Sequence, residues 1–176
     1  MAVRHAPALA QGNDQRSGTF SSWMSKYHAS SAKPLGKGTD GKLLRVCLRG
    51  SGEHHALKIP ILGSRSIEET EQEHAILKRV QGHPCMVELV GIYTGEAPAL
   101  AQGIQHTRVA PCMTMQLAGE DLSGFLKRQH RGLPPTKIVD FFCDQLLDGA
   151  AHMHGLSIIH RDIKPANILV PKVLIS

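Results

Sequence analysis

Three functional groups follow one another at fixed spacing in the run His160–Val170, and this run constrains the chain more than any other feature. An acid, Asp162, is followed two residues later by a cation, Lys164, and three residues after that by an amide, Asn167. Phosphoryl transfer uses such groups in one loop, because an Asp accepts the hydroxyl proton, a Lys holds the transferring phosphate and an Asn ligates Mg²⁺. Chance produces this pattern with a probability on the order of 10⁻⁵. The run therefore predicts a loop that serves phosphoryl transfer.

The size and composition of the chain are those of an ordinary globular protein. Its 176 residues suffice for one domain with a core or for two small lobes, and 41% of them are hydrophobic and 20% charged. The formal net charge is +5, but the lysines and arginines are scattered and form no block of like charge. Aromatic residues make up only 4% of the chain, too few for a platform on which bases stack. We therefore expect no nucleic-acid partner.

The cysteines, histidines and apolar runs of the sequence suggest neither a metal site nor a membrane. The four cysteines form no Cys-x-x-Cys pair, and no two histidines have the His-Glu-x-x-His spacing of a helical zinc site. No apolar run reaches about 18 residues, the N-terminus lacks a long apolar signal segment, and Ala2 stands where myristoylation needs glycine. We expect reduced thiols and a cytoplasmic location, with the nucleus as the alternative.

The expected elements change from strands to helices along the chain. Residues 1–26, rich in Ala, Ser, Gly and Gln, are predicted to form a disordered extension. Glycine-rich turns separate short strand-like runs, and one helix with acidic first turns and a basic end lies among them. The expected strands are Leu35, 43–48, 55–59, 86–93 and 109–117, and the expected helices are 67–80, 123–130 and 136–154. This order predicts an α+β fold.

Two further segments carry expectations about exposure. The stretch 95–107, rich in Gly, Ala and Gln, is expected to be a surface insertion between two strands. The helix at 136–154 has apolar residues on more than one face, which predicts burial from several sides.

Glycines at positions 36, 38 and 41 form a Gly-x-Gly-x-x-Gly pattern between two expected strands. A hairpin of this kind lets backbone amides approach phosphates without obstruction by a Cβ atom. The pattern is weak by itself, because about one chain in six with this glycine content carries it by chance, and a flexible turn explains it too. A dinucleotide-binding βαβ unit is disfavoured, since a strand and not a helix follows the glycines.

Lys58 lies near the end of an expected strand, and Glu73 follows fifteen residues later within an expected helix. A lone strand lysine is usually just solvated, and this one gains significance from a glutamate in the following helix that is placed to pair with it. Glu69, one turn earlier, is the rival partner. We favour Glu73 because Ile76 and Leu77, three and four positions further on, place it on the apolar face of the helix.

In order and spacing these features resemble the protein kinases, and Lys164 resembles the serine/threonine branch. The resemblance implies a bilobal α+β kinase fold with an N-lobe at 27–117, built of an antiparallel sheet and one helix. The start of a helical C-lobe would occupy 118–176. The partners that it implies are ATP, which would bind between the lobes together with Mg²⁺, and a protein substrate.

The resemblance also implies a role for individual residues. Asp162 would deprotonate the substrate hydroxyl, Lys164 would neutralise the γ-phosphate, and Asn167 would bind Mg²⁺. Met115 stands at the gatekeeper position, in front of a hinge whose backbone binds adenine. The residues implied to form the ATP site are Leu35, Gly36, Lys37, Gly38, Gly41, Leu43, Ala56, Lys58, Glu73, Met115, Gln116, Leu117, Ala118 and Leu169.

The sequence ends at Ser176, nine residues after Asn167. Protein kinases carry an Asp-Phe-Gly motif shortly after the catalytic loop, and its Asp is the principal Mg²⁺ ligand. We expect the sequence to stop just before that motif. Three functional alternatives stay open: a serine/threonine kinase, a truncated module that binds nucleotide or a partner without phosphorylating, and a product without function. The oligomeric state is not indicated.

Overall fold

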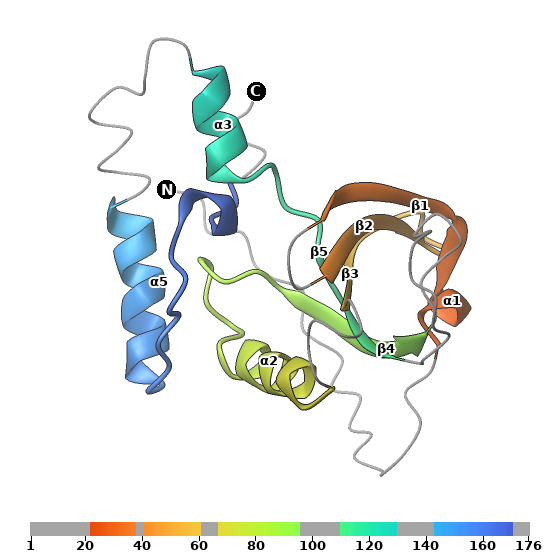
Figure 1. The fold of residues 1–176 in the computed structure, drawn as a ribbon, viewed down its shortest axis with the longest axis horizontal. Helices are drawn as coiled ribbons and strands as arrows, with labels where there is room; N and C mark the ends of the chain where they lie inside the picture. The colour runs from red at the N-terminus through yellow and green to blue at the C-terminus, as the bar shows by residue number, and fades with distance from the viewer. Residues whose placement is uncertain (1–21, 38–40, 61–66, 96–109, 130–142, 171–176) are drawn as a thin grey trace.

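The protein is described by a computed structural model that covers residues 22–37, 41–60, 67–95, 110–129 and 143–170. Five strands form one antiparallel sheet in the order β1-β2-β3-β5-β4, and the predicted α+β fold is confirmed (Figure 1). The elements are α1 (Trp23–Lys26), β1 (Tyr27–Lys37), β2 (Gly41–Leu48), β3 (His54–Pro60), α2 (Ile67–Arg79), β4 (Leu89–Gly95), β5 (Ala110–Gln116), α3 (Leu122–Arg128), α5 (Asp144–Gly155) and the 3₁₀ turn η3 (Pro165–Asn167). None of these helices is long and apolar enough to cross a bilayer.

The β2–β3 hairpin follows directly from the local sequence. Leu44 and Val46 on β2 face the same core as Leu57 on β3, and all three are buried. Gly50 and Gly52 in the connecting turn have φ angles of +88° and +73°, which side chains with a Cβ rarely adopt. The glycine-rich turn expected at 50–52 is therefore found there.

Strand β1 is longer than the sequence indicated, since only Leu35 was expected to be extended. Ser, Lys and Pro residues give this segment a weak strand preference. It is held by pairing with β2, from Tyr27 opposite Leu48 to Lys37 opposite Lys42, with two irregularities in the register. Tertiary pairing therefore overrides local preference in this strand.

The main core lies within the curved sheet and includes a residue that we had assigned to a disordered extension. Trp23 on α1 is fully buried, and it packs with Tyr27, Leu57 and Tyr93. For residues 23–26 the prediction of disorder is wrong. The polar composition of the preceding residues hid a four-residue helix with Ser22 as its N-cap. Residues 1–21 lie outside the described ranges.

The burial predicted for the long C-terminal helix is wrong where the structure describes it. Of α5, only Gly149 and Met153 are buried, and Leu147 is 67% exposed. The described contacts of α5 come from one side, where Met153 packs with Val80 after α2 and with Ile158. Residues 136–142 of the expected helix, and the expected insertion at 96–107, lie outside the described ranges.

The hydroxyl group of Tyr27 joins three strands inside the core. It lies 2.8 Å from His55 Nδ1 and donates to Thr114 Oγ1 at 3.3 Å. Burial raises the pKa of Tyr27 to about 12, so the phenol stays protonated. We expect Tyr27→Phe to lower the free energy of unfolding by about 1–2 kcal/mol, because it leaves buried partners unsatisfied. Urea denaturation of Tyr27→Phe, Thr114→Val and the double variant tests this. If the losses of the two single variants add up to that of the double variant, the two side chains are not energetically coupled, which would contradict the prediction.

Candidate active site

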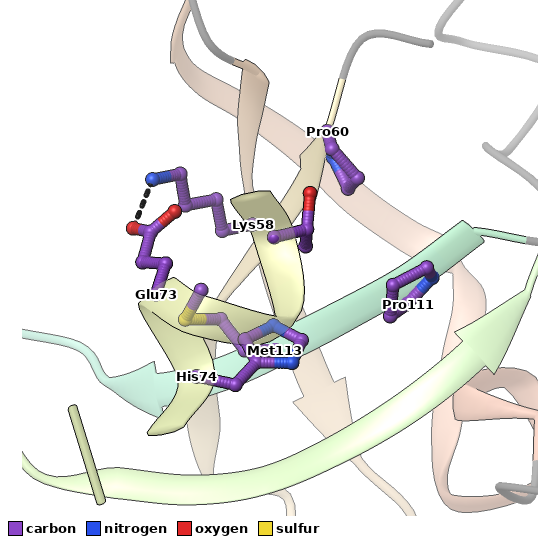
Figure 2. Close-up of a pocket in the computed structure, with 7 residues that line it drawn as sticks. Lys58, Pro60, Glu73, His74, Pro111 and Met113 are labelled. Carbon is purple, nitrogen blue, oxygen red and sulfur yellow. Dashed lines mark hydrogen bonds and ion pairs between the residues drawn. The ribbon is translucent and has the colours of Figure 1, made fainter. Parts of the chain in front are cut away.

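Lys58 and Glu73 form an ion pair between the sheet and α2. Lys58 Nζ lies 2.5 Å from Glu73 Oε1, and both side chains are partly buried (Figure 2). Glu73, the favoured of the two candidate glutamates, is therefore the residue that reaches this lysine. Glu69 lies one turn earlier on the same face of α2, beside the buried Thr70 as Glu73 is beside the buried His74. Periodicity therefore does not decide between them, and the observed ion pair does.

The strand register places further predicted residues on the same sheet face as Lys58. Lys58 is opposite Leu43 on β2 and Met113 on β5, and Ala56 is opposite Met115. Directly opposite residues of antiparallel strands point to one face. Ala56 is small and buried, so the residue two positions before Lys58 on this face is apolar and takes little room.

The backbone after β5 forms a tight turn at the predicted hinge. The Ala118 N–H donates to the Gln116 carbonyl oxygen at 3.1 Å, and the Gln116 N–H donates to Glu88 O at 2.9 Å. A purine edge offers one donor and one acceptor, which match this carbonyl and this N–H. Adenine binding would therefore exchange the Ala118–Gln116 hydrogen bond for two hydrogen bonds to the base.

The glycine pattern is only partly described, because Gly38 and the side chain of Lys37 lie outside the described positions. Gly41 is required for a reason that the sequence did not reveal. A Cβ atom there would come within 2.7 Å of the Ile59 carbonyl oxygen on β3, so Gly41 allows the two strands to pair closely. Gly36 lies at the exposed end of β1, where a Cβ atom would meet nothing within 4 Å. Its neighbour Leu35 is half-exposed.

The three groups of the catalytic-loop run meet at one carboxylate. Asp162 Oδ2 lies 2.9 Å from Lys164 Nζ and accepts a hydrogen bond of 2.8 Å from Asn167 Nδ2. The Lys164 ammonium, followed by the Asn167 amide, lowers the pKa of Asp162 below its ordinary value. The carboxylate is exposed and ionised at neutral pH, which suits a group that must accept a proton.

The backbone holds this loop in an unusual conformation. Arg161 has a φ of +66°, a left-handed conformation that is uncommon for a residue with a Cβ. The Asp162 N–H donates to His160 Nδ1 at 3.3 Å, and Asn167 Nδ2 also donates to the Asp162 carbonyl oxygen at 2.9 Å. Side chains of the motif therefore fix the backbone turn that presents Asp162.

Asp121 anchors the catalytic loop to the segment after the hinge, a role that we did not predict. Its carboxylate caps α3 by accepting from the Gly124 N–H at 2.9 Å, and its backbone bridges to Leu169. The Leu122 N–H donates to Ile168 O at 2.7 Å. The Asp before an expected helix was a recognisable capping signal, whereas the bridge joins segments far apart in the sequence.

A small pocket lies between α2 and the sheet, with the Lys58–Glu73 pair as part of its lining (Figure 2). Burial lowers the pKa of His74, which is neutral and does not compete for Glu73. The pocket is lined by Lys58, Pro60, Thr70, Glu73, His74, Pro111 and Met113. Apart from the ion pair, none of the predicted ATP-site residues lines it, so it is distinct from the predicted adenine site.

Comparison with protein families matches residues 29–174 to the family described as "Protein kinase domain". The chain belongs to the protein kinase domain family. This membership accounts for the kinase-like bilobal fold, in which the sheet and α2 form the N-lobe and the later helices part of the C-lobe. It also accounts for the shared sheet face of Ala56 and Lys58, and for the Asp162 cluster.

Individual relatives agree with the family. The chain is 33% identical over 136 residues to Myosin-IIIa of Homo sapiens, a match that covers 77% of this chain and 8% of the myosin. It is 32% identical over 139 residues to Mitogen-activated protein kinase kinase 7 of Arabidopsis thaliana, covering 77% of this chain and 40% of that protein. For Serine/threonine-protein kinase VIK of the same plant the identity is 30% over 145 residues, covering 80% and 30%. The chain therefore spans less than half the length of these relatives.

Proposed function

We propose that this chain carries the nucleotide-binding and catalytic-loop part of a serine/threonine protein kinase that transfers the γ-phosphoryl group of ATP. The observation that carries the proposal is the Asp162 carboxylate, ionised and exposed, with Lys164 Nζ at 2.9 Å. A base next to a cation is what a hydroxyl acceptor and a phosphoryl group require at the same place. The relative named a serine/threonine-protein kinase supports the choice of acceptor.

Each residue has a defined task in this proposal. Asp162 accepts the proton of the substrate hydroxyl while the hydroxyl oxygen bonds to the γ-phosphorus. The bond between the γ-phosphorus and the β–γ bridging oxygen breaks at the same time. Lys164 stabilises the charge on the transferred group, and Lys58, oriented by Glu73, holds the α- and β-phosphates. The Ala56 face and the turn at 116–118 receive the adenine.

Asn167 suits the proposed Mg²⁺ ligand. Its amide nitrogen donates to Asp162 twice, which leaves the carbonyl oxygen Oδ1 for a hard cation. Mg²⁺, when bound, would neutralise charge on the phosphates. Asp162 keeps its second carboxylate oxygen for the substrate.

The second candidate is a module that binds nucleotide without transferring phosphate. The Lys58–Glu73 pair favours it, because this pair joins β3 to α2 and involves no residue of the catalytic loop. Nucleotide binding relies on this pair, whereas transfer also needs the catalytic loop. Binding and turnover must therefore be measured separately on the same chain.

We expect ATP–Mg²⁺ to stabilise the full chain, and Lys58→Met to remove most of this effect. At an ATP concentration of about 100 times Kd, the gain in unfolding free energy is about 2.7 kcal/mol. Thermal unfolding with and without ATP–Mg²⁺ measures it, and transfer of labelled γ-phosphate, followed by identification of the phosphoamino acid, measures turnover. Lys33→Met, an exposed lysine of β1, is the matched control.

The outcomes separate the two candidates. Stabilisation together with phosphoserine or phosphothreonine supports the kinase, and stabilisation without transfer supports the binding module. Equal stabilisation of Lys58→Met and Lys33→Met would contradict both, and phosphotyrosine would contradict the proposed acceptor.

A further inference from the structure

A second cluster of reactive side chains lies away from the candidate active site, where the connection between α2 and β4 meets α5 (Figure 1). His83 and Cys85 come from this connection, and Asp148 comes from α5. One ligand-type atom of each residue lies within 4.8 Å of the other two. Among the described residues this is the one group of three such side chains that comes together.

The close approach of the two segments is built into the sequence. Gly149, next to Asp148, is buried, and a Cβ atom there would lie 3.1 Å from Cys85 Cβ and 3.0 Å from Met86 Cε. Glycine at this position therefore lets the connection pack directly on α5. Arg79 Nη2, at the end of α2, donates to Leu156 O at 2.7 Å and adds a hydrogen bond between these two segments.

The orientation of His83 is fixed by its surroundings. Its ring stacks on that of His152, with centroids 4.5 Å apart, and His152 Nε2 lies 3.1 Å from Val80 O. His83 Nε2 points to Asp148 Oδ2 at 3.3 Å. Ligand atoms on a tetrahedral zinc ion are about 3.4–3.8 Å apart, so this pair already has a spacing close to that of two ligands.

The three donors define the class of cation. Imidazole, thiolate and carboxylate together suit zinc and its neighbours in the transition series, whereas Mg²⁺ and Ca²⁺ prefer oxygen donors alone. Cysteine binds such metals as the thiolate, so the Cys85 thiol proton passes to water on coordination.

The competing interpretation is a plain hydrogen bond from His83 to the Asp148 carboxylate. In that state His83 Nδ1 accepts from the Cys85 N–H at 3.2 Å, and Nε2 carries the ring proton. A metal at Nε2 moves this proton to Nδ1, so both contacts of the imidazole are lost. Three coordinate bonds replace them, and coordination is the stronger interaction if all three side chains take part.

We propose that His83, Cys85 and Asp148 bind a zinc-type divalent cation, with water as the fourth ligand, and that the metal fastens the α2–β4 connection to α5. The cation would hold together two segments that are otherwise joined by a small apolar cluster and a few hydrogen bonds. This site is independent of the proposed phosphoryl transfer.

Titration of the chelator-treated full chain with Co²⁺ tests the proposal. We expect one Co²⁺ per chain, a thiolate-to-cobalt charge-transfer band in the near ultraviolet, displacement of the band by Zn²⁺ and none by Mg²⁺. Cys143→Ser, the exposed cysteine at the start of α5, should keep the band, and Cys85→Ser should lose it. Zn²⁺ should raise the melting temperature of the wild type and not that of Cys85→Ser.

A second variant guards against loss of folding in Cys85→Ser. Asp148 is 65% exposed, so Asp148→Asn should keep the circular dichroism spectrum of the wild type and lower the affinity for Co²⁺ at least tenfold. Absence of the band in the wild type, its persistence in Cys85→Ser, or unchanged affinity in folded Asp148→Asn would overturn the proposal.

Discussion

We expect replacement of Asp162 by Asn to lower the rate of the proposed phosphoryl transfer by about 10²–10⁴-fold, the usual contribution of a positioned general base. Asn cannot accept the hydroxyl proton, and it also removes the negative charge that holds Lys164 at 2.9 Å. Since Asp162 is exposed and lies outside the predicted adenine site, we expect the melting temperature and the stabilisation by ATP–Mg²⁺ to stay those of the wild type. The effect should therefore fall on kcat, with KM for ATP unchanged.

A matched substitution on the same lobe controls for the loss of a surface charge. Asp144 lies in the first turn of α5 and is exposed, so Asp144→Asn should leave kcat within a factor of two or so of the wild type. Steady-state transfer of labelled phosphate, measured for both variants at saturating ATP, makes the comparison. Equal kcat values for the two variants would remove Asp162 from the role of base.

The parts of the candidate site that were predictable are those whose geometry is local. Helix periodicity restricted the partner of Lys58 to one face of α2, which carries both Glu69 and Glu73, and the structure shows that Glu73 forms the pair. Spacing alone identified Asp162, Lys164 and Asn167, because side chains within six consecutive residues of one tight turn cannot move far apart. In both places a short stretch of sequence determines the relative positions of the side chains.

The parts that were not predictable depend on segments far apart in the chain. Gly41 is explained by the Ile59 carbonyl oxygen of a neighbouring strand and not by a phosphate. The anchoring of the catalytic loop through Asp121 and Leu169 joins residues 48 positions apart, counted as 169 minus 121. The cysteine count showed no metal motif, since His83 and Cys85 meet Asp148 only when α5 packs on the connection after α2. The periodicity of apolar residues along a sequence contains no information on contacts between distant segments.

The exposure of α5 also could not be predicted from the sequence. Its apolar residues correctly indicate a helix with much surface to bury, but a sequence pattern does not say which partner covers each face. The described partners contact the side of Met153, and Leu146 and Leu147 stay exposed. Hydrophobic content therefore predicted the helix and overestimated its burial within these residues.

The largest expected effect on stability comes from Trp23, the residue that composition had placed in a disordered extension. Its side chain is fully buried with Tyr27, Leu57 and Tyr93, and truncation of a buried Trp to Ala costs about 3–5 kcal/mol through lost burial and the remaining cavity. Domains of this size are stable by only about 5–15 kcal/mol. Trp23→Ala should therefore unfold a substantial fraction of the chain near physiological temperature.

Two readouts decide whether Trp23 belongs to the core or to a disordered tail. Trp23 is the single tryptophan, so its fluorescence in the wild type should be that of a buried indole and should shift to the red in urea. Circular dichroism should show a much lower urea midpoint for Trp23→Ala, a smaller loss for Trp23→Phe because most of the ring volume stays, and almost none for the exposed Ser25→Ala. A water-exposed emission in the folded wild type, or equal midpoints for Trp23→Ala and Ser25→Ala, would place this residue outside the core and restore the boundary at residue 26.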